Sequence, residues 1–364
     1  MRGTIKTEYD EIYSAYADLL YRLALSHLKN SYDAEDAVQE TFIAYFYHKG
    51  NFADDNHRKA WLVRVLLNKC TDHIRKSTRV KTVEIDDSVA AKICELEGGT
   101  AAMLTSSGQA ASFFSVFNIA SAGDHLVSSS SIYGGTYNLF AVTMKRMGIE
   151  VTFVDPDASE EELNAAFKEN TKAVFGETIA NPALNVLDIE KFAKAAHSHG
   201  VPLVIDNTFP TPVNCRPFEW GADIVTHSTT KYMDGHGAAV GGAIVDSGKF
   251  DWMAHADKFP GLCSPDESYH GITYATKFGK EGAFITKATV QIMRDLGSIQ
   301  SPQHAFILNL GLESLHVRMP RHVENAQAVA EFLEKQPEVV SVSYPGLKSN
   351  KYYDRAMKYF KNGG

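Results

Sequence analysis

The stretch THSTTKYMDGHG, residues 226–237, places one amine among hydroxylated residues and glycines. Ser228, Thr229 and Thr230 directly precede Lys231, and their hydroxyl groups are donors suited to holding an anion such as phosphate. An isolated lysine is usually a solvated surface charge, so Lys231 by itself does not indicate a site. Beside anion-binding hydroxyls, an amine that can form a Schiff base with an aldehyde becomes a candidate for covalent catalysis.

Two other segments offer partners for such a site. In TSSGQAA, residues 105–111, Gly108 allows close backbone approach and the helix that follows offers free N–H groups at its start. Taken alone, such a turn is more often only a helix cap. Asp206 ends the apolar run VPLVID, which puts a carboxylate at the carboxyl end of a buried strand. It is either a turn or cap residue or the partner of a protonated ring nitrogen.

Polar and aromatic residues in two further loops complete the set. Tyr133 in SIYGGTY could stack on an aromatic ring or pack as an ordinary loop residue. Glu177 and Asn181 in GETIANP could be polar contacts or simply turn residues before Pro182. Together the candidates provide an amine for a Schiff base, an acid for a pyridinium, donors for a phosphate and an aromatic plate. This combination predicts a site for pyridoxal phosphate, whose ring is an electron sink.

Short apolar strands and helices alternate from about residue 98 onward, and these elements must position the candidates. The predicted strands are HLVSS at 125, IEVTFVD at 149, KAVFGE at 172, VPLVID at 201, DIVTH at 223 and GGAIVD at 241. Helical stretches such as IEKFAKAAHSH at 189 separate them. The alternation predicts a mostly parallel sheet flanked by helices, with ligands bound at the carboxyl ends of its strands.

Residues 8–80 differ, because they read as helices with almost no breakers. The apolar spacing places Leu19, Leu20, Leu23 and Leu28 on one face, and Val38, Phe42 and Phe46 on one face of the next helix. We therefore expect a small all-α module over residues 1–85 and an α/β domain over residues 86–364. A C-terminal domain would begin at about residue 330, and composition places the junction only between about residues 82 and 92.

Charge and cysteine usage limit the function classes. The net charge is -8, yet residues 1–81 hold 13 Lys+Arg against 11 Asp+Glu, so contacts with nucleic acid should be sought in the front module. The four cysteines form no CxxC pair, so neither a metal site nor a disulfide framework is expected. The sequence begins without a signal peptide and contains no membrane-spanning apolar run, which predicts a cytoplasmic protein without membrane contact.

Long motifs in the α/β portion resemble one enzyme family. ELEGGTAAMLTSSGQAA, SIYGGTYNLF, ETIANPALNVLDIE, IDNTFPTPVNCRPFEWGADIVTHSTTKYMDGHG and FPGLCSPDESYHG occur in this order. They resemble the Cys/Met-metabolism family of pyridoxal-phosphate enzymes over about residues 90–364, and within it the O-acetylhomoserine sulfhydrylases. The resemblance implies PLP fold type I, a homo-oligomer, and the conversion of O-acetylhomoserine and sulfide to homocysteine and acetate.

The resemblance also assigns roles to the site residues. It implies that Lys231 binds the cofactor covalently and is the general base, and that Tyr133 stacks on the ring as a second catalytic residue. Asp206 would pair with the ring nitrogen and Asn181 with the phenolic oxygen. The residues implied for the phosphate are Gly108, Gln109, Ser228 and Thr230.

The chain also departs from the family pattern. Members have an upstream Tyr-x-Arg motif that reaches the phosphate of a neighbouring subunit's cofactor, and no such motif precedes ELEGG here. They also continue into a C-terminal domain whose arginine binds the substrate carboxylate. We therefore expect weakened cofactor binding and little sulfhydrylation by this chain alone, because a substrate without its anchor is poorly fixed for reaction.

The front module carries a second resemblance. YADLLYRLALSHLKNSYDAEDAVQETFIAYF followed by RKAWLVRVLLNKCTDHIRKS resembles region 2 of extracytoplasmic-function sigma factors. It implies contacts to the RNA polymerase core from Asp33, Glu35, Asp36, Gln39 and Glu40. It implies contacts to the promoter −10 element from Trp61, Arg64, Lys69, Arg75 and Lys76.

Three interpretations of the module and of the whole chain stay open. The module could be a dimerisation or regulatory domain, since helical periodicity alone does not specify a partner. It could be a transcription-initiation module, which basic residues interleaved with Trp61 would suit. The chain could also join fragments of two genes and perform neither task well.

Overall fold

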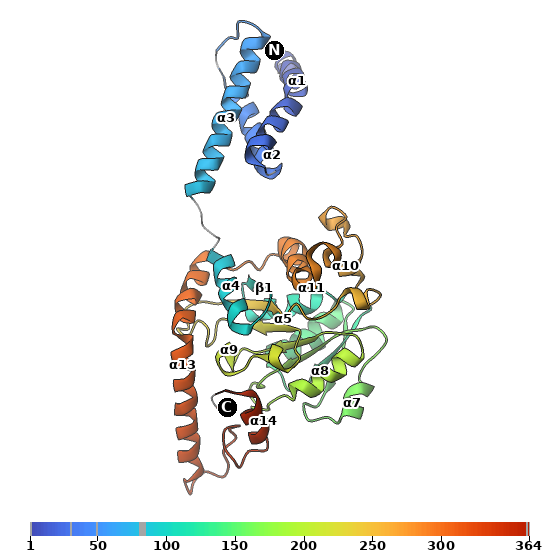
Figure 1. The fold of residues 1–364 in the computed structure, drawn as a ribbon, viewed down its shortest axis with the longest axis vertical. Helices are drawn as coiled ribbons and strands as arrows, with labels where there is room; N and C mark the ends of the chain where they lie inside the picture. Colours follow the sequence, from blue (N-terminus) through green and yellow to red (C-terminus); the bar gives the residue numbers. More distant parts are fainter. Residues whose placement is uncertain (1, 30, 49, 80–84, 362, 364) are drawn as a thin grey trace. The chain divides into compact units, whose positions relative to one another are not determined.

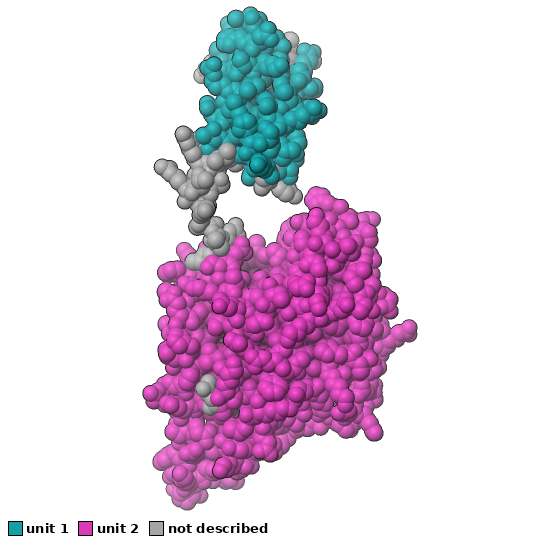
Figure 2. Space-filling model, viewed as in Figure 1, with its two compact units in different colours: residues 1–83 teal, residues 84–364 magenta. Residues whose placement is uncertain are grey.

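The computed structural model describes the chain except residues 1, 30, 49, 80–84, 362 and 364, and it also leaves the side chains of residues 2–8, 32, 72–79, 85 and 86 undescribed. The chain divides into two compact units, Met1–Val83 and Glu84–Gly364 (Figures 1 and 2). Each unit has a hydrophobic core of its own. No helix of the described residues is both long enough and apolar enough to cross a membrane.

The first unit consists of three helices that all pack against one another, α1 (Arg2–Leu28), α2 (Ser31–Phe46) and α3 (Asp55–Arg79). Leu20, Phe42, Leu62 and Leu66 are among the fully or almost fully buried residues at their centre. Burial of each such side chain stabilises the folded unit by roughly 1.5–3 kcal/mol, which explains why this short module forms a compact bundle.

Two residues of the predicted apolar helix faces are exposed and lie outside the core. Leu19 is 36% exposed, because the buried stripe of α1 follows Ile12, Tyr16 and Leu20 at four-residue spacing and leaves the preceding residue at its margin. Phe46 is 59% exposed. It is the last residue of α2, where its ring contacts only part of α1, with the Tyr9 ring centroid 5.7 Å away.

The second unit is built on a seven-stranded sheet with the order β1-β7-β6-β5-β4-β2-β3. Five strands are parallel, and β7 runs antiparallel to both β6 and β1. The strands are β1 (Ala101–Thr105), β2 (His125–Ser129), β3 (Glu150–Val154), β4 (Thr171–Glu177), β5 (Leu203–Asp206), β6 (Ile224–His227) and β7 (Gly242–Asp246). The six predicted strands are present, and β1 is an additional strand that the sequence interpretation missed.

Helices flank this sheet, as the alternating pattern predicted (Figure 1). The α-helices are α4 (Ile85–Glu97), α5 (Gly108–Phe117), α6 (Gly134–Asn138), α7 (Glu160–Ala165), α8 (Ile189–Ser198), α9 (Thr211–Asn214), α10 (Pro260–Cys263), α11 (Tyr274–Lys287), α12 (Arg294–Leu296), α13 (Pro302–Glu334) and α14 (Tyr353–Tyr359). Two π-helices, Leu139–Met144 and Ala288–Met293, and three short 3-10 helices, Pro217–Trp220, Met253–His255 and Glu267–Tyr269, complete the set.

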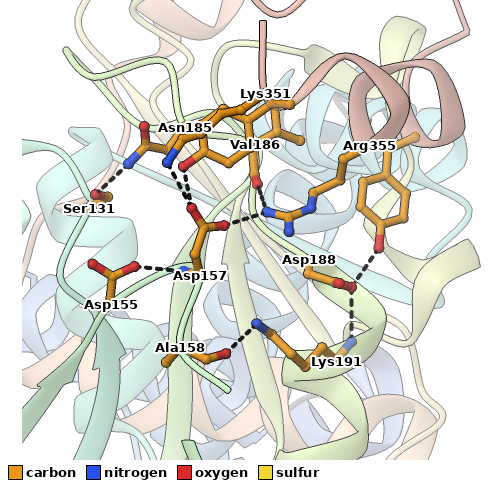
Figure 3. A network of polar contacts seen from close by, with 12 residues as sticks. Ser131, Asp155, Asp157, Ala158, Asn185, Val186, Asp188, Lys191, Lys351 and Arg355 are labelled. Carbon is orange, nitrogen blue, oxygen red and sulfur yellow. Dashed lines mark hydrogen bonds and ion pairs between the residues drawn. The ribbon is translucent and has the colours of Figure 1, made fainter. Parts of the chain in front are cut away.

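A polar network fastens α14 to the body of the second unit (Figure 3). The Asp157 carboxylate accepts hydrogen bonds from Lys351 at 3.0 Å, from the Tyr352 hydroxyl at 2.8 Å and from Arg355 at 3.0 Å. The same Arg355 nitrogen donates to the Val186 carbonyl at 2.7 Å. The Asp157 carboxylate therefore links α14 to the loop that follows β3, and Arg355 links α14 to the segment between β4 and α8.

Candidate cofactor site

A cavity of about 210 Å³ opens at the carboxyl ends of β4, β5 and β6, the position that a parallel sheet favours for a ligand. All eight residues proposed for cofactor binding line it: Gly108, Gln109, Tyr133, Asn181, Asp206, Ser228, Thr230 and Lys231. The other lining residues are Ser107, Ser112, Thr136, Glu177, Thr208, Phe209 and Val240. The structure thus brings together residues from separate loops that the family resemblance implied for one cofactor.

One end of the cavity is rich in hydrogen-bond donors. Helix α5 starts there at Gly108, and its cap residue Ser107 accepts the Ala110 N–H at 3.1 Å, so the preceding N–H groups of the first turn are available to a ligand. A Cβ atom at Gly108 would lie 2.5 Å from the Ser228 Cβ, so only glycine lets the helix start and the Ser228 loop approach this closely.

Hydroxyl groups on the opposite loop are held in place by the backbone. The Ser228 N–H donates to the Thr208 hydroxyl at 2.8 Å, and the Thr230 hydroxyl donates to the Gly241 carbonyl at 3.1 Å. Backbone N–H groups at a helix start together with nearby hydroxyls are a donor set that suits a phosphate monoester. This end of the cavity therefore fits the phosphate of the cofactor.

Two carboxyl groups also line the cavity. Asp206 is the last residue of β5, and the backbone N–H of Thr208 donates to its Oδ1 at 3.0 Å. Glu177 is the last residue of β4 and the register partner of Asp206. Burial raises the pKa of Asp206, while hydrogen bonds from Thr208 and the charge of His227 oppose the shift.

These two acids indicate what the pocket would hold. Desolvation disfavours an anion at Asp206 unless a cation lies beside it. A protonated ring nitrogen is such a cation, so the buried acid in the cavity wall fits the pyridine ring of pyridoxal phosphate.

Tyr133 and Lys231 complete the wall. Tyr133 precedes α6 and its side chain is 48% exposed, while its backbone N–H donates to the Glu177 carboxyl at 2.6 Å. Lys231 lies in the turn that follows β6. Within the described part of the chain its amine has no hydrogen-bond or ion-pair partner, so the nitrogen is accessible to an aldehyde.

A buried polar pair behind β6 was not anticipated from the sequence. His227 Nε2 lies 2.6 Å from Glu97 Oε1, and both side chains are fully buried. The Asn207 amide donates to the same Glu97 oxygen at 3.0 Å. These contacts hold the carboxyl ends of β5 and β6 against α4. The loops that carry Thr208 and Lys231 to the pocket begin at these two strand ends. Glu97 and His227 lie 130 residues apart, so no sequence spacing signals their contact.

Comparison with known proteins identifies the family. Residues 55–364 match the sequence model of the Cys/Met metabolism PLP-dependent enzymes, which is more than half of the chain. The chain belongs to this family. A homocysteine/cysteine synthase of Kluyveromyces lactis is 49% identical over 278 residues, which cover 76% of this chain and 62% of the relative. An O-acetyl-L-homoserine sulfhydrylase of Leptospira meyeri is 46% identical over 284 residues, which cover 76% of this chain and 64% of the relative.

Solved structures agree with this assignment. The O-acetylhomoserine (thiol)-lyase of Campylobacter jejuni, crystallised with N'-pyridoxyl-lysine-5'-monophosphate, has a TM-score of 0.74 and 38% identity, covering 77% of this chain and 68% of that chain. O-acetylhomoserine sulfhydrylase of Wolinella succinogenes has a TM-score of 0.69 and 34% identity, with 77% of each chain covered. The fold is PLP fold type I and the cofactor of the family is pyridoxal phosphate. The chain spans about 62% of the length of the first curated relatives.

Residues 12–80 match a second sequence model, that of Sigma-70 region 2. On α2, Glu35, Asp36 and Gln39 are exposed, whereas Asp33 is half-buried. Glu40 is also half-buried and pairs at 3.0 Å with Lys69 of α3.

The residues proposed for DNA contact differ in their accessibility. Arg64 is exposed on α3. The Trp61 ring is half-buried and packs against Tyr45, His48 and Phe52. The side chains of Arg75 and Lys76 lie outside the described residues.

Proposed function

We propose that the unit from residue 84 onward is an O-acetylhomoserine sulfhydrylase, a transferase that replaces the acetate of O-acetylhomoserine with sulfide to give homocysteine. The observation that carries the proposal is the single cavity that collects all eight residues chosen for pyridoxal phosphate. The names of the relatives, homocysteine/cysteine synthase and O-acetyl-L-homoserine sulfhydrylase, support the substrate class.

Each side chain has a defined task in this proposal. When bound, pyridoxal phosphate supplies an electron sink that stabilises negative charge at the substrate carbon. The α5 N–H groups at Gly108 and Gln109 hold the phosphate together with Ser228 and Thr230. Asp206 keeps the ring nitrogen protonated, and Asn181 binds the phenolic oxygen.

The remaining two residues act at the reacting atoms. Tyr133 covers the face of the ring and excludes water from that side. The Lys231 amine would hold the cofactor's aldehyde carbon covalently, and as a free amine it would serve as the base that takes the proton from the substrate carbon.

Turnover is tested with the full chain loaded with pyridoxal phosphate. O-acetylhomoserine and sulfide are supplied and homocysteine is measured, with Lys231→Ala as the matched control. The proposal predicts slow homocysteine formation by the parent, in line with the little sulfhydrylation expected of this chain alone, and a rate at least ~1,000-fold lower still for Lys231→Ala, a difference of about 4 kcal/mol in the barrier. Equal rates in the two proteins would contradict it.

The first unit supports a second candidate function. The match to Sigma-70 region 2 suggests that residues 1–85 form a module that binds the RNA polymerase core through the polar face of α2 and promoter −10 DNA through α3. The test is co-purification of the full chain with core polymerase. Asp36→Lys, which reverses an exposed charge on α2, should reduce recovery, and no binding by the parent would reject the candidate.

Assembly and domain limits follow from the same proposal. The family resemblance supports a homo-oligomer assembled through residues 86–364, with a C-terminal portion from about residue 330. Sedimentation of the full chain would test this, because a monomer at micromolar concentration would contradict it.

A further inference from the structure

Glu177 is a buried acid in the wall of the cofactor pocket that the roles above leave without a task. It ends β4 and is 5% exposed. Because Glu177 and Asp206 are register partners on neighbouring parallel strands, their carboxyl groups leave the sheet on the same face. The pocket therefore contains two acids, although a ring nitrogen needs only one.

The contacts of Glu177 lead to Tyr133. Its Oε2 atom accepts the Tyr133 N–H at 2.6 Å, and the backbone of Asn181 donates a second hydrogen bond to the carboxyl. Tyr133 has no side-chain cap bond and is 48% exposed, and its carbonyl accepts the Tyr137 N–H at 2.9 Å, so backbone contacts to α6 and to Glu177 position it. A Cβ atom at Gly135 would lie 2.5 Å from the Tyr133 ring, so the ring folds back over this glycine.

The surroundings of Glu177 favour the protonated, neutral form of its carboxyl group, which is the acceptor for the Tyr133 N–H. Burial, and after it the charge of Asp206 on β5, raises the pKa of Glu177, while the backbone hydrogen bonds oppose the shift. The other titratable groups on the cavity wall are Tyr133 before α6 and Lys231 after β6. His227 on β6 acts on Asp206 from behind. A neutral carboxyl still accepts an N–H bond, and a glutamine amide oxygen could do the same.

We propose that Glu177 is a positioning residue of the cofactor pocket, which holds Tyr133 against the face of the bound ring through the Tyr133 backbone N–H. This inference rests on the proposed cofactor role of Tyr133. The simpler alternative is that Glu177 only closes the turn after β4, in which case its replacement would alter stability without acting through the Tyr133 ring.

A double-mutant cycle separates these two roles. Pyridoxal phosphate is titrated by absorption into the full chain of the parent, Glu177→Leu, Tyr133→Ala and the double variant. Each single change should weaken binding about tenfold, and the double variant should be at most about twofold weaker than Tyr133→Ala, because the ring through which Glu177 acts is already absent. Independent effects that multiply to about 100-fold would overturn the proposal.

Glu177→Gln tests what the carboxyl contributes. The amide oxygen keeps the acceptor for Tyr133, so this variant should bind pyridoxal phosphate at least about fivefold more tightly than Glu177→Leu. Equal weakness of the two would show that a negative charge is required, and it would overturn the proposal. Should Glu177→Leu fail to fold by circular dichroism, Glu177→Ala replaces it in both comparisons. A parent that binds no cofactor would refute the role of Tyr133 and this inference together, whereas multiplying effects would refute the inference alone.

Discussion

At the scale of single residues, Gly108 shows how sterics shape the part of the cavity that we propose binds the phosphate. A methyl group there would overlap Ser228, with 2.5 Å to its Cβ and 2.8 Å to its Cα. Either the helix start or the Ser228 loop would have to move. Gly134, also close to the pocket in sequence, has open space around the position of its Cβ.

We therefore predict that Gly108→Ala weakens pyridoxal phosphate binding at least about tenfold, equivalent to about 1.4 kcal/mol. Equilibrium titration followed by absorption measures the effect. Gly134→Ala is the matched control and should bind within about twofold of the parent. Parental affinity in Gly108→Ala would show that the contact with Ser228 is not needed for the phosphate site.

Glu177 predicts a pH dependence of stability without cofactor. Burial and the charge of Asp206 raise the pKa of Glu177 from 4.5 to about 9. The folded state thus binds a proton that the unfolded state releases, so this group costs increasing stability as pH rises from 4.5 to about 9.

Glu177→Gln removes that cost. In thermal melts of the cofactor-free proteins, the difference in melting temperature between Glu177→Gln and the parent should therefore increase steadily from pH 5 to pH 9. Glu160→Gln, which changes an exposed acid, should show no such trend. A difference that stays constant with pH would contradict the assignment of a proton to Glu177.

At the scale of elements, the Asp157 carboxylate fastens α14 to the loop that follows β3 (Figure 3). Burial alone would raise the pKa of Asp157, but hydrogen bonds from Lys351, Tyr352 and Arg355 lower it to about 2. Because its folded pKa is below the ordinary 3.8, this carboxylate contributes stability that is complete above 3.8 and is lost as pH falls through about 2.

Asp157→Asn should therefore lower the free energy of unfolding by about 1 kcal/mol at neutral pH, a modest value because the site is partly exposed. Urea unfolding at several pH values measures it. The difference from the parent should shrink as pH falls below 3.8. A difference that is unchanged at acidic pH would show that the carboxylate charge is not what holds α14.

The elements also show which parts of the fold the sequence could predict. β-Branched runs such as DIVTH and GGAIVD predicted β6 and β7, whereas the eight residues that line the pocket were implied by the family resemblance of the motifs around them. The strand AAMLT was missed, because alanines give little strand preference and its partner β7 is 137 or more residues away. Leu19 and Phe46 were misplaced because periodicity defines a helix face without its margins.

At the scale of the whole molecule, two units with separate cores share one chain. The lining residues of the cofactor pocket all belong to the second unit. A ligand that binds only the folded state stabilises that state by RT ln(1 + [L]/Kd), which is about 2.7 kcal/mol when the free ligand concentration is 100 times Kd.

Calorimetry of the full chain should therefore resolve two transitions, of which only the one from residues 84–364 moves to higher temperature with pyridoxal phosphate. Circular dichroism assigns the other to the helical bundle, because that unit has no strand among its described residues. A single transition that shifts as a whole would show that the two units unfold together.

The most direct test of the central claim is the visible absorption spectrum of the full chain with added pyridoxal phosphate, compared with Lys231→Ala. Lys249→Ala, a lysine outside the pocket whose amine donates to the Phe218 carbonyl at 2.9 Å, is the control for loss of any lysine. We predict a cofactor band that is present in the parent and in Lys249→Ala and absent from Lys231→Ala. The same spectrum in the parent and in Lys231→Ala would contradict the assignment of this cavity as the pyridoxal phosphate site.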